Sequence, residues 1–377
     1  MSVADISSPL APPKSSSNLY LSRLPASFER VPSLDGLRAV SILIVMLSHF
    51  VDSHLFPGGF GVLVFFVISG FLITRLMLAE QKNAGRVDLR NFYLRRAFRL
   101  YPVVTVYTAV VVLFVVVTAR PFDLYEPASA LFYFANYLYA WDSMAPHAGL
   151  VKMPFTIFWS LSVEEHFYLF FPVLFVFLRG RGLVGWMAAI CAVCLALRLF
   201  FAALHPEWLQ SRFFYSTDVR LDSIAFGVLL AALCETHYAG RVIALLAQPA
   251  AVAAAIAVIL LCMAIRNDWF RETIRYTLLA MAVTVIVAAI VFSPRYAPVQ
   301  AVLNLSFVRW IGVLSYSLYV WHLLLPFLLR PVAPSLPYSA TVLVDFALSL
   351  GIAALSYYVI EKPAGALRHR FGSRTAV

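Results

Sequence analysis

The sequence predicts an all-α membrane protein, a polytopic bundle of about ten transmembrane helices. Of its 377 residues, 62% are hydrophobic and 13% are charged, whereas a soluble domain has about half apolar and about a quarter charged residues. The mean hydropathy is +0.84. Apolar runs long enough to cross a bilayer also recur along the whole chain. Together these observations exclude an ordinary soluble domain.

Each long apolar run is expected to form one helix. The runs lie near 34–52, 59–79, 101–119, 158–178, 183–204, 220–238, 242–265, 275–293, 308–330 and 339–360. A shorter aromatic segment, 128–140, is too brief to span comfortably and is expected to be re-entrant or interfacial. Residues 31–363 are therefore expected to form one membrane domain. Residues 1–30, rich in Ser and Pro and without the apolar core of a signal peptide, are expected to be a disordered tail, and 364–377 a basic tail.

Basic residues predict the orientation of the bundle. Lys and Arg gather in alternate loops, most densely in 82–99 and beyond 361, which explains the net charge of +10 without invoking nucleic acid. The positive-inside rule then places these loops and both termini in the cytoplasm, as expected for a multi-pass protein of the inner membrane. All four cysteines fall in apolar runs, including the Cys191-x-x-Cys194 pair, so neither a disulfide framework nor a metal site is indicated.

The first apolar run carries two ionisable residues, Arg38 and His49. Eleven residues separate them, which is about 16 Å along a helix and close to three whole turns, so both side chains lie on one face. Ionisable groups inside a membrane-length helix are costly and usually face a protein interior or a wet cavity. This helix is therefore expected to form the wall of a site.

Further ionisable residues are expected near the outer end of the bundle, at a depth similar to that of His49. They are contributed by the fourth, sixth and ninth runs and comprise Glu164, Glu165, His166, Asp218, Arg220, Asp222 and His322. Glu164 or Glu165 has an alternative structural role as an ion-pair partner of Arg220. His166 has an equally plain alternative, a position in the headgroup region.

A second cluster of charge is expected at the inner end, where Arg38 meets Arg95, Arg96 and Arg99. Guanidinium groups one helical turn apart suit phosphate, because they remain charged and donate two hydrogen bonds at once. The alternative is a patch that binds anionic lipid.

Seven blocks of sequence, in order, resemble the acyltransferase-3 family of membrane O-acyltransferases. They are Leu34–Ala39 with the Arg-x10-His spacing to His49, Gly61–Leu72 with Ser69, Arg95-Arg96-x-x-Arg99-x-x-Pro102, Trp159–Tyr168, Thr217–Asp222, Gly312–His322 and Glu361-Lys362-Pro363. The resemblance runs from about Val31 to Pro363 and departs at His166, where glutamine is commoner.

The resemblance implies transfer of an acyl group, often acetyl, from acyl-CoA to a hydroxyl of a cell-surface sugar, polysaccharide or glycolipid. Arg38, Arg95, Arg96 and Arg99 would bind the CoA phosphates, and His49 would take the hydroxyl proton or carry the acyl group. Glu164 would orient the imidazole. Supporting or acceptor-binding roles fall to Ser69, Glu165, Asp218, Arg220, Asp222 and His322. Acyl-CoA is then a substrate, and no permanently bound cofactor is expected. A secondary transporter or flippase is the alternative, since polar clusters at two depths would also serve transport.

Overall fold

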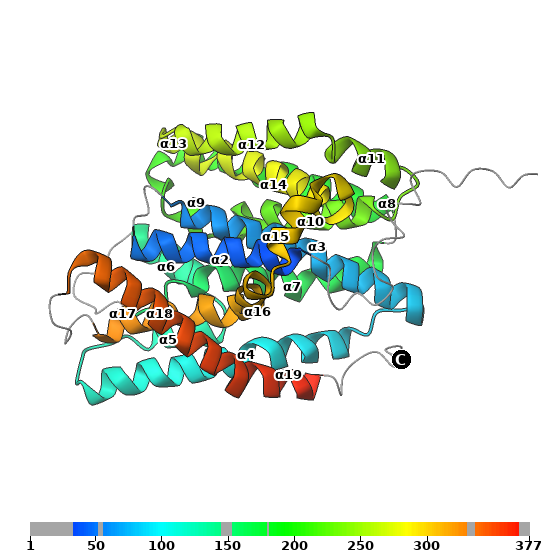
Figure 1. Ribbon diagram of the computed structural model, residues 1–377. Coiled ribbons are helices and arrows are strands. Elements are labelled where there is room, and N and C mark those ends of the chain that lie inside the picture. The colour runs from blue at the N-terminus through cyan, green and yellow to red at the C-terminus, as the bar shows by residue number, and fades with distance from the viewer. Residues whose placement is uncertain (1–32, 52–55, 145–152, 179–180, 330–335, 369–377) are drawn as a thin grey trace, which may run out of the picture.

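The computed structural model describes residues 33–51, 56–144, 153–178, 181–329 and 336–368, and every regular element within these ranges is helical (Figure 1). The longer helices are α2 (Leu34–Phe50), α3 (Gly58–Ala84), α4 (Leu89–Val117), α7 (Phe158–Phe177), α8 (Arg181–Leu204), α10 (Leu221–Leu233), α12 (Pro249–Ala264), α14 (Ile274–Phe292), α16 (Ser306–Trp321) and α18 (Tyr338–Ser356). The shorter ones are α5 (Tyr125–Leu131), α6 (Ala135–Met144), α9 (Arg212–Tyr215), α11 (Ala239–Leu246), α13 (Asp268–Glu272), α15 (Ala297–Leu303), α17 (Leu324–Leu329) and α19 (Lys362–Arg368). Single turns lie at Pro206–Trp208, Thr217–Val219, Pro294–Tyr296 and Tyr357–Glu361.

A helix occupies each of the ten predicted runs, but fewer than ten meet the length of a membrane span. Of the described residues, seven helices are long and apolar enough to cross a bilayer, or eight if one bent pair counts as a single span. Helix α2 has 17 residues and α10 has 13, because α10 begins only after the turn at Thr217–Val219. The all-α class is confirmed, whereas the count of ten spans is not.

Two predicted runs differ from the structure in their helix boundaries. The run 242–265 is a bent pair, α11 and α12, with a 59° angle at a break before Pro249. Proline at the first turn of α12 has no N–H to continue the preceding helix. Helix α4 begins at Leu89, twelve residues before the predicted start, where the Asp88 carboxylate accepts a hydrogen bond from the Asn91 N–H at 3.0 Å. The arginine cluster therefore lies on the spanning helix itself.

Segment 128–140 forms α5 and α6, two short helices that pack against α4 and α7. Their lengths agree with the prediction that this segment does not span. The predicted tail 1–30 lies outside the described residues. Helix α19 extends to Arg368, so only residues 364–368 of the predicted basic tail are described, and they are helical.

Helix α2 lies near the middle of the bundle, against α3 and α16 (Figure 1). Two glycines on these neighbours permit the close approach. A Cβ on Gly312 of α16 would lie 1.8 Å from the Asp35 carbonyl oxygen, and one on Gly61 of α3 would lie 2.6 Å from the Ser41 carbonyl oxygen. Because neither contact leaves room for a methyl group, α2 is fixed between its neighbours.

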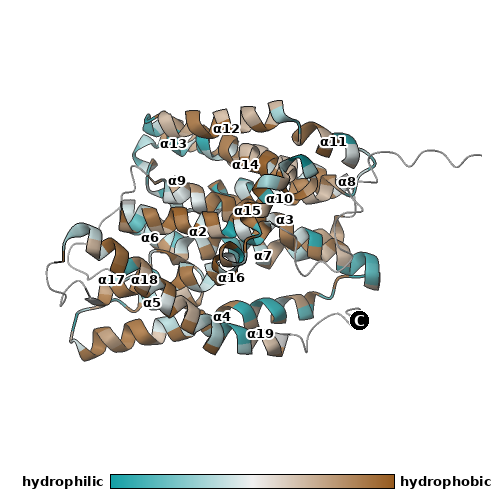
Figure 2. Ribbon diagram, viewed as in Figure 1, coloured by the Kyte–Doolittle hydropathy of each residue, from teal (hydrophilic) through white to brown (hydrophobic). Residues whose placement is uncertain are grey.

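The helices run between two ends of the bundle. Helices α6, α9 and α13 lie towards one end, and α11 and the last residues of α3 lie towards the other (Figure 1). Figure 2 shows apolar residues along most of the helices and more polar ones where α3 ends and α4 begins. Alternate loops therefore lie at the same end of the bundle, as the alternation of basic loops in the sequence predicts. The cytoplasmic position of the termini stays a prediction.

Candidate active site

His49 and His322 contact one another directly, although 273 residues separate them in the sequence. The His322 Nε2 and His49 Nδ1 atoms are 3.1 Å apart, and the ring centroids are 5.0 Å apart. His49 is in the last turn of α2, and His322 follows the last residue of α16. The sequence placed both residues at one depth but did not predict that they form a pair.

The surroundings of His322 determine which nitrogen atoms carry protons. Its Nδ1 lies 2.8 Å from the Tyr319 carbonyl oxygen and 3.2 Å from that of Leu318, and both of these oxygens can only accept. Nδ1 of His322 therefore carries its proton, and the lone pair of Nε2 accepts the Nδ1–H of His49. His49 is left with an unprotonated Nε2, which is the form of imidazole able to accept a proton.

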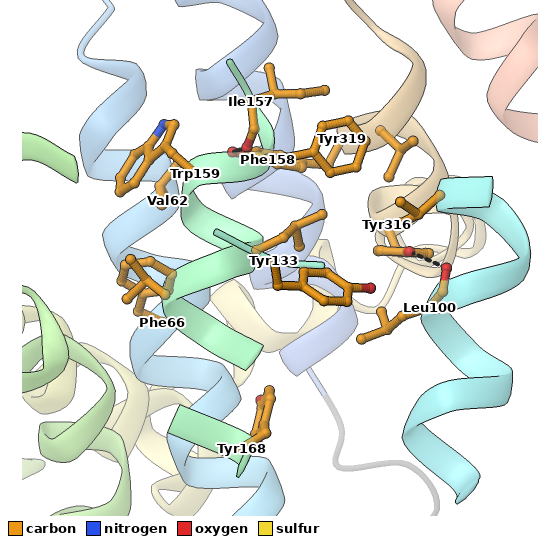
Figure 3. Close-up of a cluster of buried hydrophobic side chains, with 14 of the residues drawn as sticks. Val62, Phe66, Leu100, Tyr133, Ile157, Phe158, Trp159, Tyr168, Tyr316 and Tyr319 are labelled. Carbon is orange, nitrogen blue, oxygen red and sulfur yellow. Dashed lines mark hydrogen bonds between the residues drawn. The ribbon is translucent and has the colours of Figure 1, made fainter. Parts of the chain in front are cut away.

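A cavity of about 400 Å³ opens beside His49. It lies among α2, α3, α7, α9 and α14, with Thr156 and Ile157 from the end of the 120–157 connection in its wall. Its aromatic and cationic lining comprises Phe60, Trp159, Phe214, Tyr215, Tyr276, Tyr319, Arg266, Arg271 and Arg275. Figure 3 shows Trp159 beside Val62, with the Tyr319 hydroxyl bonded to the Ile157 carbonyl oxygen at 2.9 Å. His49 is thus accessible from a pocket large enough for part of a sugar.

Glu164 has different partners from the one predicted. Its carboxylate accepts hydrogen bonds from the hydroxyls of Ser69 and Tyr168, the second at 2.9 Å, whereas the hydrogen bond of His49 joins it to His322. Trp159 of the same helix lines the cavity, and Glu164 lies five residues further along, about 7.5 Å deeper. The predicted orienting contact between Glu164 and His49 is therefore not formed, because the two side chains differ in depth.

Glu165 forms an ion pair with Arg96, whose guanidinium also lies 3.6 Å from the centre of the Tyr168 ring. This pair joins a residue predicted at the outer level to one predicted at the inner level. Nearby, Tyr133 is buried with a φ of 55° and a hydroxyl that has no hydrogen-bond partner among the described residues (Figure 3). Glu164 and Glu165 therefore lie at a depth between the predicted outer and inner levels.

The four predicted donor-binding arginines do not form a single cluster. Arg95 is paired with Glu80 at 2.9 Å, and Arg96 with Glu165. Arg38 and Arg99 lie close enough to repel one another, and Arg38 has only a long 3.7 Å contact to Asp35. Among the described residues Arg99 has no ion pair, so this second pair of guanidiniums is the more available for an anionic ligand.

The triplet from the sixth run separates into three environments. Asp218 pairs with Arg212 at 2.6 Å. Asp222, fully buried, pairs with Arg198 at 2.6 Å and accepts a hydrogen bond from Thr277.

Arg220 is also fully buried, but none of its guanidinium nitrogens has a hydrogen-bond partner among the described residues. Its guanidinium lies 3.7 Å from the centre of the Tyr276 ring. Neither Glu164 nor Glu165 pairs with it, so that structural alternative is wrong.

Arg198 and His166 are two residues whose surroundings the sequence did not predict. Arg198 was missed, although a charged residue inside the apolar run of α8 was a usable signal. His166 lies away from His49, with its Nδ1 2.8 Å from the Thr217 hydroxyl, and lines a second, largely apolar cavity of about 500 Å³. Its placement supports a packing role. Over the described ranges, no three His, Cys, Asp or Glu side chains gather as metal ligands do.

Comparison with known proteins identifies the family of the chain. A family profile described as an acyltransferase domain, Acyl_transf_3, matches residues 31–361. A Staphylococcus aureus (strain COL) protein named "Putative O-acetyltransferase" is 30% identical over 355 residues, and O-acetyltransferase OatA of Staphylococcus aureus (strain NCTC 8325) is 27% identical over 348. Each alignment covers 88% of this chain but 57% of the relative. No solved structure matches. The chain belongs to the acyltransferase-3 family.

Proposed function

We propose that the protein is a membrane O-acetyltransferase, which moves an acetyl group from cytoplasmic acetyl-CoA to a hydroxyl of a cell-surface glycan or glycolipid. The observation that supports this best is the His49–His322 pair, which leaves an unprotonated imidazole nitrogen beside a cavity. The names of the relatives, both O-acetyltransferases, favour acetyl as the transferred group.

Helix α2 connects the two parts of such a site. Arg38 and Arg99 would bind the phosphates of CoA at one end of the helix, where persistent positive charge is available. His49 lies eleven residues further on, about 16 Å along the axis, near the reach of a pantetheine arm. The thioester would then lie between the arginines and the cavity, while the acceptor would enter from the cavity side.

The chemistry follows from the tautomer of His49. Its Nε2 takes the proton of the acceptor hydroxyl as that oxygen attacks the thioester carbonyl carbon. The C–S bond then breaks, and the imidazolium gives the same proton to the leaving thiolate, so that an ester and free CoA are formed. While His49 is charged, its Nδ1–H continues to donate to His322, whose lone pair stabilises the cation.

Glu164 and its partners take a supporting role in this proposal. Glu164 and Glu165 are held by Ser69, Tyr168 and Arg96, between the arginine pair and the cavity. Because Arg96 neutralises Glu165, it is the charge of Glu164 that would keep CoA phosphates at the Arg38 end and leave the neutral pantetheine arm to pass. Arg220 would shape the wall behind the cavity, since it lies against Tyr276 of the lining, while Asp218 and Asp222 would hold Arg212 and Arg198 in place.

The decisive experiment uses the purified full chain in nanodiscs with labelled acetyl-CoA. Loss of thioester that depends on His49 and on an added sugar supports the proposal. A secondary transporter or flippase would instead exchange solute across a vesicle membrane without His49 and without consuming thioester. His237→Ala is a suitable control, because that histidine is exposed and lies beside α11.

A further inference from the structure

The cavity beside His49 is strongly cationic. Three arginines line it, Arg266, Arg271 and Arg275, and none of its described lining residues is Asp or Glu. Arg271 is 3.3 Å from Asp268 in an exposed pair, and Arg275 is 3.9 Å from Glu272. Arg275 also donates its Nε–H to the Arg271 carbonyl oxygen at 3.1 Å. A guanidinium has five N–H donors, so these contacts leave other donors of Arg271 and Arg275 available for a ligand.

A fourth arginine behind the lining adds an independent observation. Arg220 is fully buried, and its three guanidinium nitrogens lack hydrogen-bond partners in the described part of the chain. It lies against Tyr276, a residue of the cavity wall, 3.7 Å from the ring centre. A buried guanidinium without hydrogen-bond acceptors is costly even over an aromatic ring, and a negative charge brought into the cavity would offset part of that cost.

The rest of the lining is mainly apolar and includes several aromatic rings. Rings from four different segments face the cavity, those of Trp159, Phe214, Tyr276 and Tyr319. Trp159 and Phe214 contact one another, with ring centroids 4.8 Å apart. Flat apolar walls with a few charged groups suit a ligand that has both an apolar ring face and a charge, such as an acidic sugar.

We infer that this cavity binds an acceptor sugar that carries an anionic group, a carboxylate or a phosphate, held by Arg271 and Arg275 while a hydroxyl of the sugar faces His49. The inference rests on the proposed O-acetyltransferase activity, because it assigns the substrate class of that site. It gives the arginines a task separate from that of Arg38 and Arg99, at the other end of α2. The acceptor is therefore an acidic glycan rather than a neutral one.

Binding measurements test the inference without requiring turnover. Isothermal titration of the full chain in phosphatidylcholine nanodiscs would use methyl glucoside, methyl glucuronide and methyl glucoside 6-phosphate as probes. We expect at least one anionic probe to bind about tenfold or more tightly than methyl glucoside, since hydrogen bonds to charged groups are the strong ones. Whichever anionic probe binds more tightly identifies the group as carboxylate or phosphate.

Charge-removing variants locate the interaction. Arg271→Gln and Arg275→Gln should each reduce the preference for the anionic probe, whereas Arg295→Gln, an exposed arginine elsewhere on the bundle, should leave it unchanged. Equal affinity for charged and neutral probes, no binding of any probe, or an unaltered preference in both variants would overturn the inference. So would full loss of sugar binding on adding phosphatidylglycerol to the nanodiscs, which would identify a lipid headgroup as the occupant.

A final arm separates this inference from the proposed function. His49→Ala should keep the preference for the anionic probe over methyl glucoside, because His49 acts on a hydroxyl that both probes share and not on the anion. If the unaltered chain binds the anionic sugar selectively but transfers no acetyl group to any acceptor, the proposed function fails while the anion site stands. If it acetylates neutral sugars as well as acidic ones, with no anion preference in binding, the anion site fails while the proposed function stands.

Discussion

Replacing His322 tests the arrangement that distinguishes His49 from an ordinary helix histidine. His322→Phe removes the Nε2 lone pair that accepts the His49 Nδ1–H at 3.1 Å but keeps a ring in a fully buried position. His49 then loses the contact that selects its tautomer and stabilises its charged form. A hydrogen bond to a charged group contributes about 1.5–3 kcal/mol. At about 1.4 kcal/mol for each factor of ten, kcat should fall about 10- to 100-fold.

The assay is the initial rate of acetyl transfer at saturating acceptor, with the KM for acetyl-CoA measured in parallel. The KM should remain unchanged, because Arg38 and Arg99 lie at the other end of α2. His322→Gln, whose amide oxygen can accept, should recover part of the loss. His49→Ala should cost more, about 10²–10⁴-fold, as removal of a general base does.

The double variant of His49 and His322 should be little worse than His49→Ala, since residues that act as a unit are not additive. Losses that add strictly, or a His322→Phe enzyme with normal kcat, would refute the tautomer argument. His237→Ala is the matched control for removal of an imidazole far from the site.

Three further predictions concern other parts of the chain. Arg99→Gln should raise the KM for acetyl-CoA more than Arg95→Gln does, because Arg95 is already paired with Glu80; equal effects in a kinetic assay would count against the division of the arginine cluster. Gly312→Ala should lower the thermal midpoint by several degrees, since its Cβ would lie 1.8 Å from a backbone oxygen, and an unchanged midpoint would contradict that packing. Burial raises the pKa of Glu126 to about 7, so the folded protein keeps a proton that the unfolded chain loses near pH 4.5. The free energy of unfolding should therefore fall as the pH rises from 4.5 to about 7, and the thermal midpoint of Glu126→Gln should not show this pH dependence.

Sequence reasoning predicted the helices well because hydropathy and helix length depend on local composition. It predicted α4 as too short, because the arginines in its first turns interrupt the apolar pattern although the helix begins after the Asp88 cap. It joined α11 to α12, because the proline between them interrupts hydrogen bonding without interrupting the apolar pattern. Local signals thus predict where the helices lie better than how each one begins or bends.

The site was harder to predict because its contacts depend on depth and on helix rotation. His49, His322 and Glu164 were assigned one level, yet five residues along α7 were enough to take Glu164 away from the cavity. The Arg198–Asp222 pair joins α8 to α10, and the periodicity of the sequence does not show that these two helices are neighbours. Residue type identified the candidates, and only the packing of the helices determined their partners.

The packing of α2 bears on the proposed function, in which His49 would act on a donor held at Arg38. The distance of about 16 Å between Arg38 and His49 is useful only if it is constant, because a misplaced thioester reacts slowly. Gly312 holds α2 near the Arg38 end and Gly61 holds it near the middle, each through a contact with a backbone oxygen. Such close approaches leave no room for a larger residue at either glycine, so they keep α2 packed tightly between α3 and α16. In the proposed function, helix α2 would therefore act as a rigid spacer between donor and base, and the two glycines packed against it would set that distance.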